Sequence, residues 1–233
     1  PSIKGKLKSK PYQQLRFRPE ESRIFLSKTI LDDHDCNTVH QLCKGIPGRL
    51  AAIKRLLISG TSLSSILETD PSKYLEFIKL EFSSLEQMDD SQKLIVATIS
   101  FSKIPLSIGD LSNLLSEPDE KIRETLTASQ FLALNSTTGI IEFVSVSHRK
   151  FSEKQLEKFR KSALTAQIEH LLKNPKSSAS LRFLPSYYET LSQHESIISL
   201  ISKEHYSDLL ESTQSFVALR NRAEMGARNA LSL

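Results

Sequence analysis

Two short motifs carry residue types that could contact a bound ligand. The first is Gly45-x-Pro47, a turn that opens directly into an amphipathic helix. Glycine lets the backbone approach another group closely, and a proline in the first helical turn is rigid, apolar and without an N–H. The second is His148, in the stretch SVSHRKF directly after a predicted strand. Its imidazole can donate a hydrogen bond or carry partial charge near neutral pH. Taken alone, each motif is also common as ordinary helix punctuation or as a structural histidine.

A second group of chemically capable residues is His34, Cys36, His40 and Cys43, all within ten positions. His34 and Cys36 fall in a predicted turn, whereas His40 and Cys43 have the spacing of one helical face. Zinc ligands normally come from two separate elements, so a tetrahedral site from this one stretch is unusual. We therefore expect two thiols, buried or at the surface, in a reducing cytoplasm, and no metal site.

No complete active site is visible in the sequence. There is no G-x-x-x-x-G-K-[ST] loop that would cradle phosphates and no apolar strand ending in paired acids. No Ser/His/Asp order or carboxylate pair indicates catalysis. The remaining histidines, His170, His194 and His205, fall in polar helical contexts and are expected at the surface. These residues alone are therefore not expected to hydrolyse ATP.

The composition is typical of a soluble, α-rich globular protein. Of 233 residues, 39% are hydrophobic and 25% charged, with no Trp and only seven Gly. No apolar run approaches the length of a membrane span and no signal peptide opens the chain, so we expect a cytoplasmic protein with no membrane partner. The net charge of +4 is dispersed, which does not favour a nucleic-acid-binding patch. Because the chain starts abruptly without an initiator Met, we expect it to be part of a longer polypeptide.

The apolar pattern predicts a mainly α fold: a small helical bundle, a winged helix with a short β-hairpin, and α-helical repeats. The predicted parts are residues 1–18 with a strand over Tyr12–Phe17, residues 19–87 as the bundle with Gly45-x-Pro47, residues 88–151 as the winged helix, and residues 152–233 as TPR-like repeats.

Turn and cap signals place the helices of the bundle. Pro19 starts a helix whose apolar side is expected to include Ile24, Phe25, Ile30 and Leu31. A short helix over Thr38–Lys44 ends at Gly45, and Asp70 is expected to cap a helix that begins at Pro71.

From Asp89 the pattern is helix, short extended piece, helix, helix and hairpin, which is the winged-helix order. The third helix spans Glu117–Gln130, and the strands are Phe131–Leu134 and Ile140–Val146 around Gly139. Small residues that suit close helix contacts recur near the C-terminus: Ala218, Ala223, Gly226, Ala227 and Ala230.

This order of parts resembles the STAND class of signal-transduction ATPases, which includes NB-ARC proteins, NACHT proteins and bacterial antiviral relatives. The segment GIPGRLAAI, Gly45 to Ile53, looks like the G-L-P-L segment of that family. SVSHRKF stands where the family carries its winged-helix histidine motif, M-H-D in many members, although Arg149 departs from that pattern. The resemblance covers nearly all of the chain and would begin just after the P-loop ATPase core, so residues 1–18 would be the end of that core.

The resemblance implies the regulatory part of an oligomerising nucleotide switch in immune or antiviral signalling. Pro47 would pack on the adenine, Gly45 would let the backbone approach, and His148 would reach the β-phosphate of ADP. The cofactor would be ATP or ADP, with Mg²⁺ held by the missing core, and the full-length protein would be an ATPase. The expected partners are further copies of the protein and a sensed protein or other ligand at the helical repeats.

Two other functions remain open. The first is a transcriptional regulator whose helix Glu117–Gln130 enters the major groove of DNA. That helix sets Lys121 and Arg123 against four acids and is a poor partner for phosphates, so nucleic acid is not expected at the winged helix. The second is a scaffold of helical repeats that binds no nucleotide.

Overall fold

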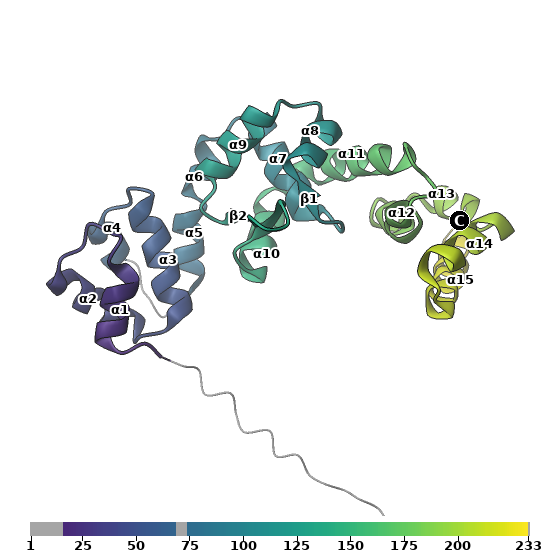
Figure 1. The fold of residues 1–233 in the computed structure, drawn as a ribbon. Helices are drawn as coiled ribbons and strands as arrows, with labels where there is room; N and C mark the ends of the chain where they lie inside the picture. The colour runs from purple at the N-terminus through teal and green to yellow at the C-terminus, as the bar shows by residue number, and fades with distance from the viewer. Residues whose placement is uncertain (1–15, 69–73, 233) are drawn as a thin grey trace, which may run out of the picture. The chain divides into compact units, whose positions relative to one another are not determined.

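The computed structural model describes residues 16–68 and 74–232, and over these residues the protein is mainly helical with one small antiparallel sheet, as predicted (Figure 1). The chain divides into two compact units, residues 1–83 and 84–233. The second unit contains both the segment predicted as a winged helix and the segment predicted as repeats. Most of the predicted strand Tyr12–Phe17 lies outside the described residues, and its last two residues are not in a strand. Asp70 and Pro71 also lie outside the described residues.

The first unit is a bundle of short helices. They are α1 (Pro19–Leu26), α2 (Asp33–Cys43), α3 (Pro47–Ile58), α4 (Leu63–Leu67) and α5 (Tyr74–Glu81). Their shared core consists mainly of aliphatic side chains and the two thiols: Leu26, Cys36, Val39, Cys43, Leu50, Ile53, Leu56, Leu57 and Ile66.

Two expectations for the bundle are wrong in detail. Ile24 and Ile30 were expected on an apolar side but are 74% and 94% exposed. The buried face of α1 contains Ser22 and Leu26, which leaves Ile24 outward, and Ile30 lies beyond the end of the helix. The helix expected over Thr38–Lys44 begins earlier, at Asp33. Asp32 is its N-cap, with the Asp35 N–H donating to Oδ1 at 2.8 Å.

The second unit begins with the elements of a winged helix. After α6 (Ser83–Gln87), they are α7 (Asp90–Phe101), β1 (Leu106–Ser107), α8 (Ile108–Leu115), α9 (Asp119–Ala128), β2 (Leu132–Leu134) and β3 (Ile140–Phe143). The strands pair antiparallel in the order β1-β3-β2, with Leu106 opposite Ile141 and Leu132 opposite Phe143. This is the helix, strand and hairpin order that the sequence predicts.

Further helices follow without a break in the unit. They are α10 (Val146–Gln155), the 3₁₀ turn η1 (Glu157–Phe159), α11 (Arg160–Leu172), α12 (Ser178–Thr190), α13 (His194–Ser199), α14 (Lys203–Thr213) and α15 (Phe216–Ala230). We call α11–α15 the helical array. Of the small residues in α15, only Gly226 is buried: a Cβ there would lie 2.9 Å from Ile201 Cδ1, whereas Ala223, Ala227 and Ala230 are exposed.

Buried hydrogen bonds join the winged helix to the helical array. The Gln167 side chain on α11 donates through Nε2 to the Thr98 carbonyl on α7 at 3.0 Å. The Tyr187 hydroxyl on α12 donates to Gln167 Oε1 and accepts from the Lys103 N–H at 2.7 Å. Tyr187 is fully buried. Helices α7, α11 and α12 are therefore tied by directional bonds in addition to apolar packing.

Candidate functional site

The Gly45 turn is shaped by a backbone contact inside the first unit. Gly45 has φ +66°, in the left-handed region, and its carbonyl accepts from the Phe17 N–H at 2.8 Å. A Cβ on Gly45 would lie 2.3 Å from the Phe17 carbonyl oxygen and 3.2 Å from the His40 ring. The close approach that requires glycine here is therefore that of Phe17.

Pro47 lies at the first position of α3, two residues after Gly45. Its helix starts after Ile46, which is extended, with φ −74° and ψ 116°. The proline is half-buried, and the first turn of α3 contains no acidic residue. The structure thus brings Gly45 and Pro47 together on one turn, where part of the Pro47 ring remains accessible.

His148 belongs to the second unit and lies on a helix, not at the end of a strand. Strand β3 ends at Phe143 rather than at Val146, and Ser145 caps α10. The His148 Nδ1 lies 2.7 Å from Ser145 Oγ, and the His148 N–H donates to the same oxygen at 3.4 Å. The histidine is fully buried. The imidazole is therefore held in a fixed orientation by the helix cap.

Arg149, which departs from the M-H-D pattern, has a structural partner. Its Nε donates to the Ser100 carbonyl at 2.9 Å, and its Nη2 donates to the Ser102 carbonyl. These carbonyls lie at the C-terminal end of α7, where helices leave acceptors unsatisfied. Arg149 also pairs with Glu153 at 3.3 Å. Its side chain therefore ties α10 to the end of α7.

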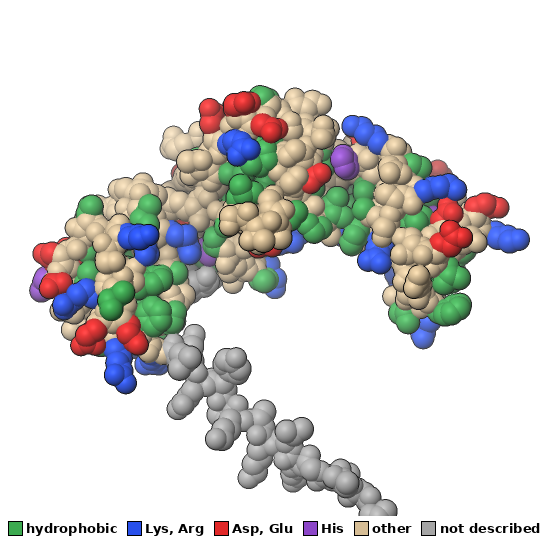
Figure 2. Space-filling view, viewed as in Figure 1, with side chains coloured by type: hydrophobic (Ala, Val, Ile, Leu, Met, Phe, Trp, Pro, Cys, Tyr) green, Lys and Arg blue, Asp and Glu red, His purple; other side chains and the backbone are tan. Residues whose placement is uncertain are grey.

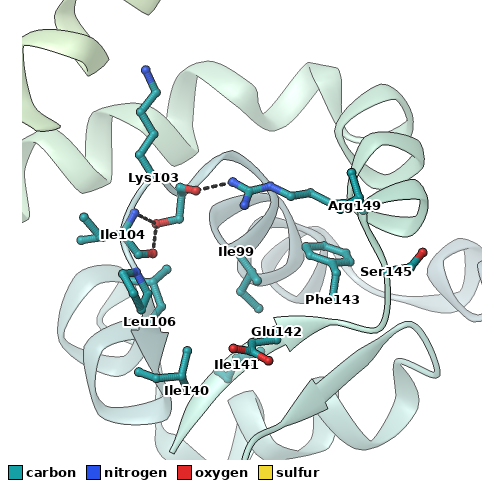
Figure 3. A pocket seen from close by; sticks show the side chains of 13 residues that line it. Ile99, Lys103, Ile104, Leu106, Ile140, Ile141, Glu142, Phe143, Ser145 and Arg149 are labelled. Carbon is teal, nitrogen blue, oxygen red and sulfur yellow. Dashed lines mark hydrogen bonds between the residues drawn. The ribbon is translucent and has the colours of Figure 1, made fainter. Parts of the chain in front are cut away.

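A cavity of about 400 Å³ lies beside this arginine, lined by the end of α7, strands β1 and β3, and the start of α10. In Figure 3, Leu106 lies on the side of Lys103, Phe143 lies on the side of Arg149, and Ile99 lies in the middle of the view. Ser145 also lines the cavity, so His148 is one hydrogen bond away from it. Sequence spacing gives no signal for this cavity, because its walls come from segments about 40 residues apart.

The two thiols are inert core residues of α2. Cys36 and Cys43 are free and buried, and burial raises the pKa of the Cys43 thiol to about 12. Burial and nearby acids, with Asp33 the largest of them, raise the pKa of Cys36. Within the described residues, no three His, Cys, Asp or Glu side chains are grouped so as to hold a metal ion. His40 instead bonds Ser22 Oγ through Nδ1 at 2.8 Å.

The expectation that His170, His194 and His205 are surface residues is wrong. All three are half-buried. His194 Nδ1 lies 2.6 Å from Asn229 Oδ1, and His205 Nε2 lies 2.7 Å from Arg222 Nη1. The Nδ1 atom of His170 is buried and has no hydrogen-bond partner among the described residues. Local polarity misled the prediction, because the partners are 35 and 17 residues away.

Comparisons with protein-family models, with curated proteins and with solved structures find no match to this chain. Within residues 16–68 and 74–232, no helix has both the length and the apolar character needed to span a membrane.

Proposed function

We propose that this chain is the regulatory part of a STAND-type, nucleotide-dependent oligomerising switch. In this proposal the winged helix packs on an ATPase core that lies outside these 233 residues, and ADP holds the two closed. Exchange of ADP for ATP releases the winged helix, which lets protomers assemble. The helical array senses a protein or other ligand and biases this equilibrium.

The observation that carries the proposal is the continuous packing from the winged helix into the helical array. Helix α11 packs along α7. The Gln167 side chain donates to the Thr98 carbonyl of α7, and the Tyr187 hydroxyl accepts from the N–H of Lys103, just after α7. A sensor can bias a switch through packed and hydrogen-bonded elements when a displacement of one element moves the other. These bonds supply such a connection between the sensing and the nucleotide-linked parts.

The exposed face of α9 supports a winged helix that packs on protein rather than on DNA. Figure 2 shows acidic side chains over this helix, and Asp119, Glu120 and Glu124 are exposed. Lys121 lies 3.6 Å from Glu117 and 3.8 Å from Asp89. A basic residue already paired with acids has little left to offer a phosphate backbone.

His148 is proposed to make the closed state selective for ADP. A ligand shifts an equilibrium only by its unequal affinity for the two states. A hydrogen bond to a charged phosphate contributes about 1.5–3 kcal/mol, which is roughly one to two decades in the closed-to-open ratio. In the chain alone the ring is fully buried and its Nδ1 faces Ser145 Oγ, so the proposal requires the imidazole to become accessible when the core is bound.

The test is the rate of ADP release and the oligomer size of the full-length polypeptide with His148→Ala. We expect faster release by roughly 10–100-fold and more spontaneous assembly, because a closed-state contact is lost. Ser145→Ala is a second variant of the same contact: it keeps the imidazole but removes the oxygen that orients it, so we expect a smaller effect of the same sign. Pro47→Ala should weaken the binding of ADP and of ATP to the same extent, because both nucleotides contain adenine. The role of His148 is refuted if His148→Ala releases ADP and assembles as the wild type does.

A further inference from the structure

We propose that the helical array contains an oxyanion-binding site. The oxyanion would be a carboxylate or phosphate group on the ligand that the array recognises. The site is a pocket of about 530 Å³ formed by α12, α14, α15 and the residue Lys103 between α7 and β1. Three cationic residues line it, Lys103, Arg182 and Arg222, and no acidic residue does. We call it the cationic pocket.

Arg222 is the unusual member of this pocket, because its residue is only 6% exposed. Its Nη1 donates to His205 Nε2 at 2.7 Å and its Nη2 to the Leu181 carbonyl at 2.8 Å. Both acceptors are neutral, and within the described part of the chain Arg222 makes no ion pair. A buried charge is costly unless it is paired. The missing counter-ion is the feature that an anionic ligand would supply.

The other two cations also lack carboxylate partners. The Lys103 ammonium donates to the Ser186 carbonyl at 3.0 Å and to Thr190 Oγ1 at 3.3 Å, and Arg182 is exposed with no ion pair to any described residue. Glu189, whose charge acts on Lys103, lies 3.2 Å from Arg228. The positive charge of the pocket is therefore not neutralised from within.

The remaining walls define the rest of the ligand. Asn221 and Ser186 offer hydrogen-bonding groups, while Phe183, Leu209 and Met225 are apolar. An oxyanion with an apolar portion next to it fits this mixture better than a bare ion does. The biological purpose of the site rests on the proposed function, since it names the chemistry of the sensed ligand, but the binding itself rests only on these residues.

The experiment measures thermal unfolding of the 233-residue chain at constant ionic strength, with chloride replaced by one of two probes. The probes are inorganic phosphate and an end-blocked peptide of alternating Glu and Leu. At a concentration ten times Kd, we expect a bound probe to raise Tm by about 3–6 °C. A shift with phosphate alone assigns a phosphate-bearing ligand, a shift with the peptide alone assigns an acidic protein segment, and a shift with both assigns a general oxyanion site.

Arg182→Ala is the diagnostic variant, because Arg182 is exposed and its removal leaves no new unpaired charge in the interior. We expect it to weaken the binding of whichever probe raises Tm by roughly 10–100-fold, and we expect Arg182→Lys to restore part of that binding. Arg123→Ala on α9, which removes another exposed arginine, should bind as wild type does. The proposal is overturned if neither probe raises Tm, or if Arg182→Ala and Arg123→Ala have equal effects. Because no ATPase core takes part, that outcome leaves the nucleotide switch to be judged separately.

Discussion

A methyl group added to Gly45 would meet the Phe17 carbonyl oxygen at 2.3 Å, at a residue whose φ is +66°. The backbone and the Phe17 segment must both shift to accept it. We therefore expect Gly45→Ala to lower the free energy of unfolding by about 1–3 kcal/mol, measured by urea denaturation.

Gly48→Ala is the matched control for this substitution. Gly48 lies in the first turn of α3, and no atom lies within 4 Å of a Cβ built there. Alanine favours the helix, so we expect stability to be unchanged or to rise by up to about 1 kcal/mol. Equal losses in the two variants would show that the Gly45 turn can relax without cost.

His205 gives the second unit a pH-sensitive contact. Burial and the Arg222 guanidinium lower the pKa of His205 below its ordinary 6.5, and Asp208 opposes this shift. Because the unfolded chain takes up the proton more readily, the contribution of the contact is full above pH 6.5 and is lost as the pH falls through the lower folded pKa. We expect the free energy of unfolding to fall more steeply between pH 7.5 and pH 5 in the wild type than in His205→Gln. Equal slopes would contradict this account.

At the scale of residues, the sequence indicates which side chains are candidates for a site, but not how buried they are or which partners they contact. Gly45, Pro47 and His148 stand out by type and spacing, and all three do lie at helix starts or turns. The burial of His148 and the His205–Arg222 bond depend on contacts across the fold, which no local pattern reports. For the same reason Arg222, the key residue of the cationic pocket, gave no signal in the sequence.

At the scale of elements, the connection between winged helix and helical array depends on Tyr187. Replacing it with Phe leaves the Lys103 N–H and Gln167 Oε1 without their partner while preserving the ring. We expect Tyr187→Phe to destabilise the second unit by about 1–3 kcal/mol in urea denaturation.

Tyr188→Phe is the control next to it in the chain. Tyr188 is also buried, at 8% exposed, but its hydroxyl makes no hydrogen bond within the described residues. Its removal should change the free energy of unfolding by less than about 0.5 kcal/mol. If both variants are equally stable, the connection between α7 and α12 is apolar packing alone.

Element order was predictable because apolar periodicity and caps are local signals. The helix, strand and hairpin order after Asp89 is confirmed by the structure. Boundaries failed where a cap was missed: Asp32 starts α2 early, and Ser145 ends the hairpin segment early. These residues are compatible with several local structures, and packing decides among them.

At the scale of the molecule, the mainly α architecture was predictable from composition and periodicity. The continuous second unit was not, because it depends on how α11 packs along α7. The division of the chain into four functional parts, the TPR-like character of the array and the absence of DNA binding at α9 stay predictions. So do ATP or ADP as cofactor, with Mg²⁺, and self-association.

The most direct test of the switch is the nucleotide content of the full-length polypeptide, purified from cells without added nucleotide. After denaturation, the released nucleotide is identified and counted per chain by chromatography. The account predicts close to one ADP per monomeric chain, because ADP stabilises the closed state against assembly. A polypeptide that carries no nucleotide, and that binds neither added ADP nor added ATP with Mg²⁺, would contradict the account.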